Sequence, residues 1–315
     1  PATAVLMAVL SGTETRQSVE RSLRGGGRDW VAAAFHGGLL ASLALTLGVL
    51  VALLVDIARR GVPVLAERGA SFFTVGYSTI PSRAGVGQAL VGSAFLMATV
   101  ILVAFPIGIA AAVYLEEYAP DTRLTRLINA NIRNLAGVPS IVYGLLGLSL
   151  FVKLLGPLTG GPTMIAGGLT LSMLVIPIVI ITTAEALRAV PDSIREAGFG
   201  VGATRWEVVR SHVLPYAAPG VLTGVILSLA RAFGETAPLI LAGAKLGFFA
   251  SGTGGLASQL TGPYTALPTV AFLFSRQPNP DFQALAGAAA LVLLGVLLAL
   301  NSVAIALRNR YERGR

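Results

Sequence analysis

The sequence predicts an all-α protein that crosses a lipid bilayer about six times. Of its 315 residues, 54% are hydrophobic and only 12% are charged, whereas soluble domains carry about 25% charged residues. Six stretches are apolar over roughly the 20 residues that a transmembrane helix needs. Basic residues gather in alternate connections between these stretches, which is the bias that marks the inner side of a membrane.

The six apolar stretches follow one another along the chain. They cover residues 35–57, 88–114, 135–155, 164–187, 217–242 and 282–307. Pro139 and Lys153 interrupt the third of them, and Lys153 is expected to reach water from its outer end. A shorter apolar run over residues 267–274 cannot span a bilayer, so we expect a re-entrant or interfacial helix there.

The distribution of charge predicts the orientation. With six spans both termini share one side, and the connections on that side hold 15 basic residues against 6 on the other. We therefore expect both termini to be cytoplasmic. Residues 1–30 would form an N-terminal tail, 31–310 the transmembrane domain and 311–315 a C-terminal tail.

Composition weighs against several kinds of site. The chain has no cysteine, which excludes disulfides and thiolate metal sites, and His36 and His212 alone do not favour a zinc enzyme. It also lacks the loop G-x-x-x-x-G-K followed by Ser or Thr that cradles nucleotide phosphates. We expect no enzymatic activity, no bound cofactor or metal, and no nucleic-acid partner, since the net charge of +8 is explained by the inner loops.

The connection between the fourth and fifth stretches carries helix signals. Ser193 and Glu196 have the spacing of a capping box, and Thr204 and Glu207 repeat it. Glycines between them allow a tight turn, and Pro215 is expected to end the second helix. The prediction is two short helices at an angle, presented to a soluble partner. An ordinary interfacial loop is the main alternative; a DNA-binding helix-turn-helix is disfavoured by the flanking spans.

This connection resembles the signature loop of ABC importer permeases, of the form E-A-A, three residues, G, nine residues, I-x-L-P. The matching positions are Glu196, Ala197, Gly202, Leu214 and Pro215. Gly198 replaces the third small residue of the pattern, and His212 replaces its isoleucine. In that family the loop forms a coupling helix that seats in a separate ATPase subunit, which uses ATP and Mg²⁺.

The resemblance implies a type I ABC importer permease fold, with residues 188–215 as the signature loop. The residues it implies for coupling are Ser193, Glu196, Ala197, Gly202, Ala203, Thr204, Trp206, Leu214 and Pro215.

Three further stretches resemble the phosphate-specific permeases. They are PIGIAAAVYLEEYAP (106–120), LAGVPSIVYGL (135–145) and ARAFGETAPL (230–239). The run GETAPL, the absence of a large domain in the first outer loop and SRQPNP (275–280) are similar to the PstA type. The resemblance implies half of a phosphate path in a bacterial cytoplasmic membrane, with a PstC-type permease, a PstB-type ATPase dimer and a PstS-type extracytoplasmic binding protein as partners.

Several alternatives remain open on the sequence alone. The chain could be the paired PstC-type subunit, or a permease for another oxyanion such as molybdate or sulfate. It could also be a phosphate-sensing membrane scaffold that uses the same loop, or an ion channel that needs no ATPase.

Two charged residues suggest where an anion would pass. Arg231 is expected near the middle of the fifth span, where a charge is costly, with Glu235 one turn later on the same face. A guanidinium can bind phosphate through two hydrogen bonds, and Glu235 would hold it when no anion is present; an ion pair that only fixes helix packing is the alternative. Side chains that could add donors to the path are Asn134, Ser140, Tyr143, Ser228 and Thr236.

Overall fold

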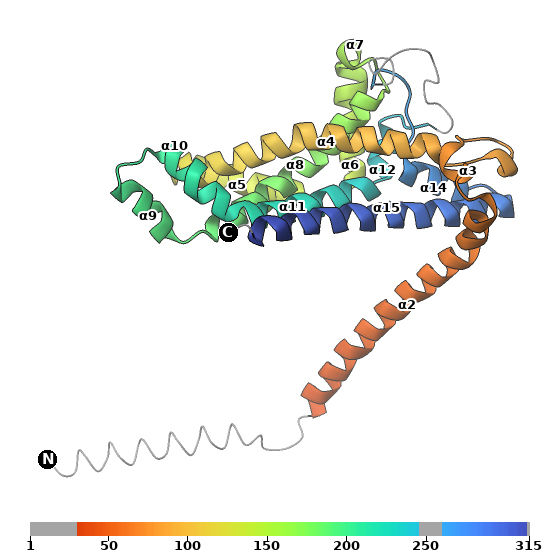
Figure 1. Cartoon of the computed structure of the whole chain (residues 1–315), viewed down its shortest axis with the longest axis horizontal. Helices are drawn as coiled ribbons and strands as arrows, with labels where there is room; N and C mark the ends of the chain where they lie inside the picture. The colour runs from red at the N-terminus through yellow and green to blue at the C-terminus, as the bar shows by residue number, and fades with distance from the viewer. Residues whose placement is uncertain (1–29, 246–259, 314–315) are drawn as a thin grey trace. The chain divides into compact units, whose positions relative to one another are not determined.

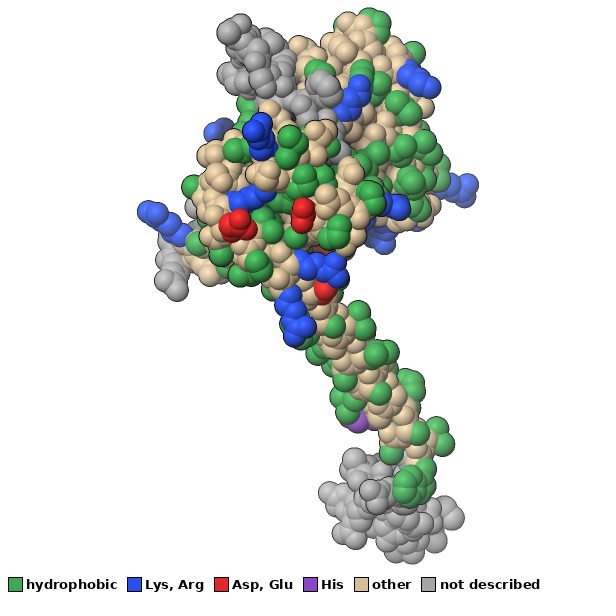
Figure 2. Space-filling model, turned by 90° about the vertical axis from the view of Figure 1, so that its right-hand side faces the viewer, with side chains coloured by type: hydrophobic (Ala, Val, Ile, Leu, Met, Phe, Trp, Pro, Cys, Tyr) green, Lys and Arg blue, Asp and Glu red, His purple; other side chains and the backbone are tan. Residues whose placement is uncertain are grey.

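The computed structural model describes residues 30–245 and 260–313. They form two units, the first ending at Val55 and the second beginning at Asp56. The first unit contributes the beginning of helix α2 (Trp30–Arg68). Its side chains over residues 30–55 are exposed and mostly apolar, as the hydrophobic surface of this helix in Figure 2 shows. A helix that is apolar all round suits lipid or a partner helix rather than water.

Long helical rods make up most of the second unit (Figure 1). Their parts are α4 (Gly87–Val113) with the π-helix η2 (Tyr114–Tyr118); α8 (Met164–Arg188); α10 (Arg205–Val208) with the π-helix η4 (Val209–Val213) and α11 (Leu214–Gly234); and α15 (Pro280–Arg313). α8 packs against α4 and α11, and α11 also packs against α15. The rods therefore form a bundle with α8 at its centre.

Shorter helices lie at the ends and sides of this bundle. They are α3 (Ser71–Thr74), the 3-10 helix η1 (Pro81–Arg83), α5 (Arg123–Ala136), α6 (Ser140–Gly147), the π-helix η3 (Leu148–Leu154), α7 (Gly156–Thr159), α9 (Asp192–Gly200), α12 (Ala237–Leu241) and α14 (Leu267–Ser275). Figure 1 places α9 and α10 at one end of the bundle, here called the α9 end, and α3 at the opposite end.

Five of the described helices are long and apolar enough to cross a membrane, or six if the bent pair of α5 with α6–η3 counts as one span. The described residues include no strand. The predicted all-α class with about six spans is therefore confirmed. The apolar run expected between the last two spans is the short helix α14, which packs against α15 and α4.

Small residues let α8 approach its neighbours closely. A Cβ atom added to Gly168 would lie 2.7 Å from the side chain of Thr99 on α4, and one added to Gly224 on α11 would lie 2.3 Å from the hydroxyl of Thr182. Membrane helices associate largely through such close packing, because lipid is as apolar as their side chains.

The first predicted span ends at residue 57, whereas α2 continues to Arg68, and the third and fifth predicted spans are interrupted in the structure. The third was expected from residue 135, but α5 ends at Ala136, and α6 begins at Ser140 after a bend of 101°. Pro139 causes this, because the residue before a proline is disfavoured in helical geometry. The fifth was expected to reach residue 242, but α11 ends at Gly234. In a continuous helix the ring of Pro238 would clash with the carbonyl of Gly234, four residues earlier.

Helix α5 was missed as a separate element. It is amphipathic, with Leu124, Leu127 and Ile128 exposed and with Arg123, Arg126 and Arg133 among its polar residues. Thr122 begins it, since its hydroxyl oxygen accepts from the backbone N–H of Thr125. Its arginines come directly before the apolar stretch that begins at residue 135, so the sequence predicted an inner loop here instead of a helix.

Candidate functional site

The predicted pair of Arg231 and Glu235 exists, but at a helix end. Arg231 lies in the last turn of α11 and Glu235 is the residue that ends it, with an extended backbone. Their Nε and Oε1 atoms are 3.5 Å apart. The expectation that Arg231 lies near the middle of the helix was therefore wrong, because the helix ends before Pro238, whereas the predicted pairing with Glu235 is present.

This placement leaves the guanidinium accessible. The side chain of Arg231 is 53% exposed, whereas that of Glu235 is 16% exposed. A cation also interacts favourably with the carbonyl-rich end of a helix. The structure thus presents a positive group, loosely held by one carboxylate, at an interruption between α11 and α12.

The break lies against another of the stretches singled out in the sequence. α6 packs against α12, and a Cβ atom on Gly144 would lie 2.7 Å from the Cα atom of Pro238. The backbones of LAGVPSIVYGL and ARAFGETAPL therefore touch. The close approach of α12 therefore requires a glycine at position 144 of α6.

The hydrogen-bonding candidates divide into two groups. Tyr143 is buried and its hydroxyl donates to the carbonyl of Leu135 at 2.8 Å, and the Ser228 hydroxyl donates to the carbonyl of Gly224 at 2.7 Å, so both are satisfied locally. The remaining candidates, for whose side chains the described residues give no hydrogen bond, are Asn134, Ser140 and Thr236. Asn134 is exposed, and the other two are half-buried.

The signature loop folds as two helices joined by a glycine turn, as predicted. Gly202 has φ +83°, a conformation that glycine adopts without strain. Thr204 begins α10 with a capping box: the hydroxyl of Thr204 accepts from the backbone N–H of Glu207 at 3.4 Å, and Glu207 Oε2 accepts from that of Thr204 at 2.7 Å. The second predicted capping box is thus confirmed.

Other details of the loop were predicted wrongly. α9 begins at Asp192 after Pro191 and has no side-chain cap, so Ser193 lies inside the first turn and does not pair with Glu196 as a capping box. Pro215 does not end a helix: it lies in the first turn of α11, and the rod runs through it. Proline has no backbone N–H to donate to the carbonyl four residues earlier. It is tolerated here because that carbonyl lies in the π-helical segment, where the α-helical bonding pattern is already interrupted.

The loop presents an exposed surface. Glu196, Ala197, Gly202, Thr204 and Trp206 are exposed, while Ala203, Leu214 and Pro215 are half-buried. Gly198, the departure from the E-A-A pattern, is buried, and a Cβ atom there would lie 2.7 Å from Val208. A glycine at this position lets α9 lie directly on α10.

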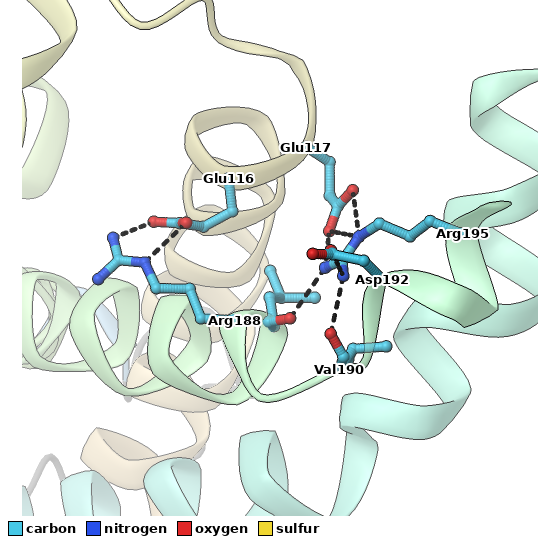
Figure 3. A network of polar contacts seen from close by, with 7 residues as sticks. Glu116, Glu117, Arg188, Val190, Asp192 and Arg195 are labelled. Carbon is cyan, nitrogen blue, oxygen red and sulfur yellow. Dashed lines mark hydrogen bonds and ion pairs between the residues drawn. The ribbon is translucent and has the colours of Figure 1, made fainter. Parts of the chain in front are cut away.

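Sequence reasoning missed a network of ion pairs at the α9 end (Figure 3). Arg195 on α9 donates to Glu117 of η2, with Nη2 to Oε1 2.8 Å, and to the carbonyl oxygens of Leu187 at 3.0 Å and Val190 at 2.8 Å. Its Nη1 is also 3.2 Å from Oδ1 of Asp192. The hydrogen bond to Glu117, more than any other cause, raises the pKa of Arg195 above its usual value.

A second pair lies beside the first. Arg188, at the end of α8, donates through Nε to Oε2 of Glu116 at 2.8 Å and through Nη2 to Oε1. These partners are more than 70 residues apart in sequence, so no local spacing could have indicated them. The only signal in the sequence was a pair of acidic residues after the second predicted span and arginines at the end of the fourth span and in the signature loop.

Among the described residues, no three His, Asp or Glu side chains gather in a way that could hold a metal ion.

The family relationship follows from comparison with known proteins. The family described as "Binding-protein-dependent transport system inner membrane component" matches residues 104–314, which include the signature loop and Arg231. The chain belongs to this family of transport permeases.

Individual relatives narrow the relationship. The permease is 36% identical over 230 residues to the phosphate transport system permease protein PstA of Xylella fastidiosa (strain Temecula1), covering 72% of this chain and 77% of that protein. It is 34% identical over 242 residues to PstA of Haemophilus influenzae, covering 77% and 81%. A probable ABC transporter permease protein of Bacillus subtilis, YqgI, is 36% identical over 169 residues, covering 54% and 56%. The resemblance to PstA-type permeases is thus confirmed.

Solved structures support the fold. The permease aligns with a chain of the inward-facing MetNI methionine ABC transporter with a TM-score of 0.54 and 18% identity, over 71% of this chain and 96% of that one. A bacterial ABC transporter that imports alginate gives a TM-score of 0.59 at 14% identity, over 94% and 99%. At these identities the likeness shows the fold alone, and it confirms the type I ABC importer permease fold.

Proposed function

We propose that this chain is the PstA-type permease subunit of an ATP-driven phosphate importer. The relatives named as phosphate permeases supply the substrate class. The observation that carries the proposal within the chain is the half-exposed guanidinium of Arg231 at the end of α11, held by Glu235 at 3.5 Å. Phosphate is an anion with several acceptor oxygens, and a guanidinium can hold two of them at once.

In this proposal the substrate path is built around the break between α11 and α12. Arg231 binds the anion, and Glu235 takes its place as the counter-ion when the path is empty. Asn134, Ser140 and Thr236 offer hydrogen-bond donors that the described residues do not use, while Tyr143 shapes the wall through its bond to Leu135.

ATP hydrolysis is assigned to a separate PstB-type ATPase dimer that uses Mg²⁺. The exposed surface of α9 and of the residue that follows it would seat in a groove of that ATPase; it includes Phe199 and Val201, which are 48% and 83% exposed. A PstC-type permease would supply the other half of the path, and a PstS-type binding protein would deliver phosphate at the α3 end.

The chain would cross the bacterial cytoplasmic membrane with its α9 end and both termini in the cytoplasm. The basic residues of the signature loop and of the end of α15 support this orientation. ATP-driven movement of α9 would then expose the region of Arg231 to one side of the membrane and to the other in turn.

Uptake by membrane vesicles tests the proposal. Vesicles that contain the chain with its partner subunits and binding protein should accumulate radiolabelled phosphate when ATP is inside. Arg231→Gln should lower the initial rate at least about tenfold, since a charge-assisted hydrogen bond contributes about 1.5–3 kcal/mol. Arg126→Gln is a matched control, because Arg126 belongs to an exposed ion pair with Asp121 outside the long rods.

The outcomes separate the alternatives. Normal uptake by an assembled Arg231→Gln complex would exclude a role for this arginine in the path. Inhibition of phosphate uptake by equal concentrations of sulfate or molybdate would indicate a different oxyanion as substrate. Uptake in vesicles that lack any ATPase would indicate a channel instead.

A further inference from the structure

Arg195 connects three parts of the permease. It lies on α9, its Nε and Nη2 donate to Glu117 in η2 at the end of α4, and its Nη1 and Nη2 donate to the carbonyl oxygens of Val190 and Leu187 at the end of α8. Figure 3 shows the guanidinium between these groups. With the further bond to Asp192, these contacts can occupy all five N–H groups of the arginine.

The ion pair between Arg195 and Glu117 is shielded from water. The side chain of Glu117 is 7% exposed and that of Arg195 is 19% exposed. Buried charges need a partner, and the fixed fork of a guanidinium resists rotation when both of its edges are bonded. The two carbonyl oxygens that accept from Arg195 lie at the last turn of α8 and just beyond it, on Leu187 and Val190. The contact is therefore both directional and costly to separate.

α9 has a second attachment of a different kind. Gly198 packs on Val208, which joins α9 to the rod of α10 and α11. That contact is apolar and can slide, whereas the bonds of Arg195 tie α9 to the ends of α4 and α8. A force applied to α9 would reach α11 through packing and would reach the other two rods through Arg195.

We propose that Arg195 and Glu117 form a joint that carries the movement of α9 to α4 and α8. This rests on the proposed function, in which an ATPase moves α9. The two residues act as positioning residues: they touch neither nucleotide nor anion. Without them α9 would no longer be tied to α4, and it would be joined to α8 only through residues 189–191. Hydrolysis would then be poorly coupled to transport.

The neighbouring pair provides a matched control. Glu116 and Glu117 are adjacent in η2 and both accept from an arginine, but the arginine that Glu116 bonds is Arg188 of α8 rather than a residue of α9. Its arginine is also 46% exposed. Glu116→Gln therefore removes the same charge from the same helix without opening the joint.

The test compares ATP hydrolysis with phosphate uptake in the same vesicles. Glu117→Gln and Arg195→Lys should lower the phosphate taken up per ATP hydrolysed about tenfold, equivalent to one charge-assisted hydrogen bond, while Glu116→Gln should change it less than about twofold. Lysine keeps the charge but lacks the fork that reaches Glu117 and two carbonyls together. A ratio equal to that of the unaltered complex in both joint variants, or an equal fall in Glu116→Gln, would overturn the proposal.

A distance measurement tests the joint without transport. Because the chain has no cysteine, spin labels can be placed at Tyr114→Cys in η2 and Gly200→Cys in α9, both exposed positions. In the assembled complex the distance between the labels should stay narrow and unchanged when ATP is added, and it should broaden in Glu117→Gln. A distribution in Glu117→Gln identical to that of the labelled parent would refute the joint.

The two measurements also separate the two proposals. If the unaltered vesicles take up no phosphate, the proposed function fails, but the label distances still decide whether α9 and α4 move together. If phosphate is taken up and the joint variants stay coupled, the proposed function stands and the joint fails.

Discussion

Replacing Gly144 with alanine should push α6 and α12 apart at the candidate path. A Cβ atom at this position would lie 2.7 Å from the Cα atom of Pro238, about 1 Å closer than carbon atoms normally pack. Because this neighbour is backbone, it cannot rotate away, and α12 must move. Overpacking of this kind costs about 1–3 kcal/mol, while alanine in place of glycine gains about 1 kcal/mol of helix propensity.

Gly295→Ala is the matched control for Gly144→Ala. Gly295 also lies inside a helix, α15, but has no atom within 4 Å of an added Cβ, so it should show the propensity gain without the clash. The difference between the two variants should therefore be about 1–3 kcal/mol. In a protein of this size it corresponds to roughly 2–10 °C between their thermal midpoints, measured on the purified protein in one detergent.

Transport should follow the same order. Movement of α12 displaces the break that holds Arg231, so Gly144→Ala should lower phosphate uptake in vesicles more than Gly295→Ala does. Equal midpoints and equal uptake rates in the two variants would contradict this prediction and would show that the contact between α6 and α12 is looser than the structure indicates.

Three other changes test local contacts. Thr204→Ala should destabilise the protein by about 1 kcal/mol, seen as a lower thermal midpoint, because Glu207 loses its capping partner; a midpoint equal to the parent would contradict the cap. Tyr143→Phe should cost about 1 kcal/mol by removing the hydrogen bond from the tyrosine hydroxyl to the carbonyl of Leu135, with little change in the uptake rate if the tyrosine only shapes the wall of the path. Arg68→Ala removes two hydrogen bonds to carbonyl oxygens after α3 and should speed proteolysis of residues 69–86; an unchanged cleavage rate would count against this role.

The spans and the turn of the signature loop could be predicted because their causes are local. Apolar runs of about 20 residues predict membrane helices wherever they occur. Gly202 needs no partner to adopt a positive φ, and Thr204 and Glu207 satisfy one another three residues apart. The spacing of the signature loop can be recognised in the sequence for the same reason, since its residues act on near neighbours along the chain.

The wrong details came from signals that compete. Ser193 has the spacing of a cap, but Pro191 starts the helix earlier, at Asp192. Pro238 could have predicted the end of α11, because a proline clashes with the carbonyl four residues earlier in a helix. The apolar residues that continue past Gly234 instead suggested an unbroken span. Arg231 was then placed too far from a helix end.

The ion-pair network could not be predicted from local patterns. Glu117 and Arg195 are 78 residues apart, and their meeting depends on how α4, α8 and α9 pack. Neither residue is unusual where it stands, since acidic residues after a span and arginines in an inner loop are both ordinary. What makes them a pair is burial, which appears only in three dimensions.

The π-helical segments also affect how this permease can be altered. η4 lies between α10 and α11, and a π-helix turns less per residue than an α-helix, so its five residues shift the angular phase of the rod by about a quarter turn. A helical wheel drawn from Arg205 at 100° per residue would consequently assign the wrong sides to everything beyond Leu214. Deleting a single residue within η4 should let the rod rewind as a regular α-helix, and four α-helical residues turn about as far as the five π-helical ones. Arg231 should then keep its present direction, so a single deletion here shortens the rod without rotating the side chains beyond it.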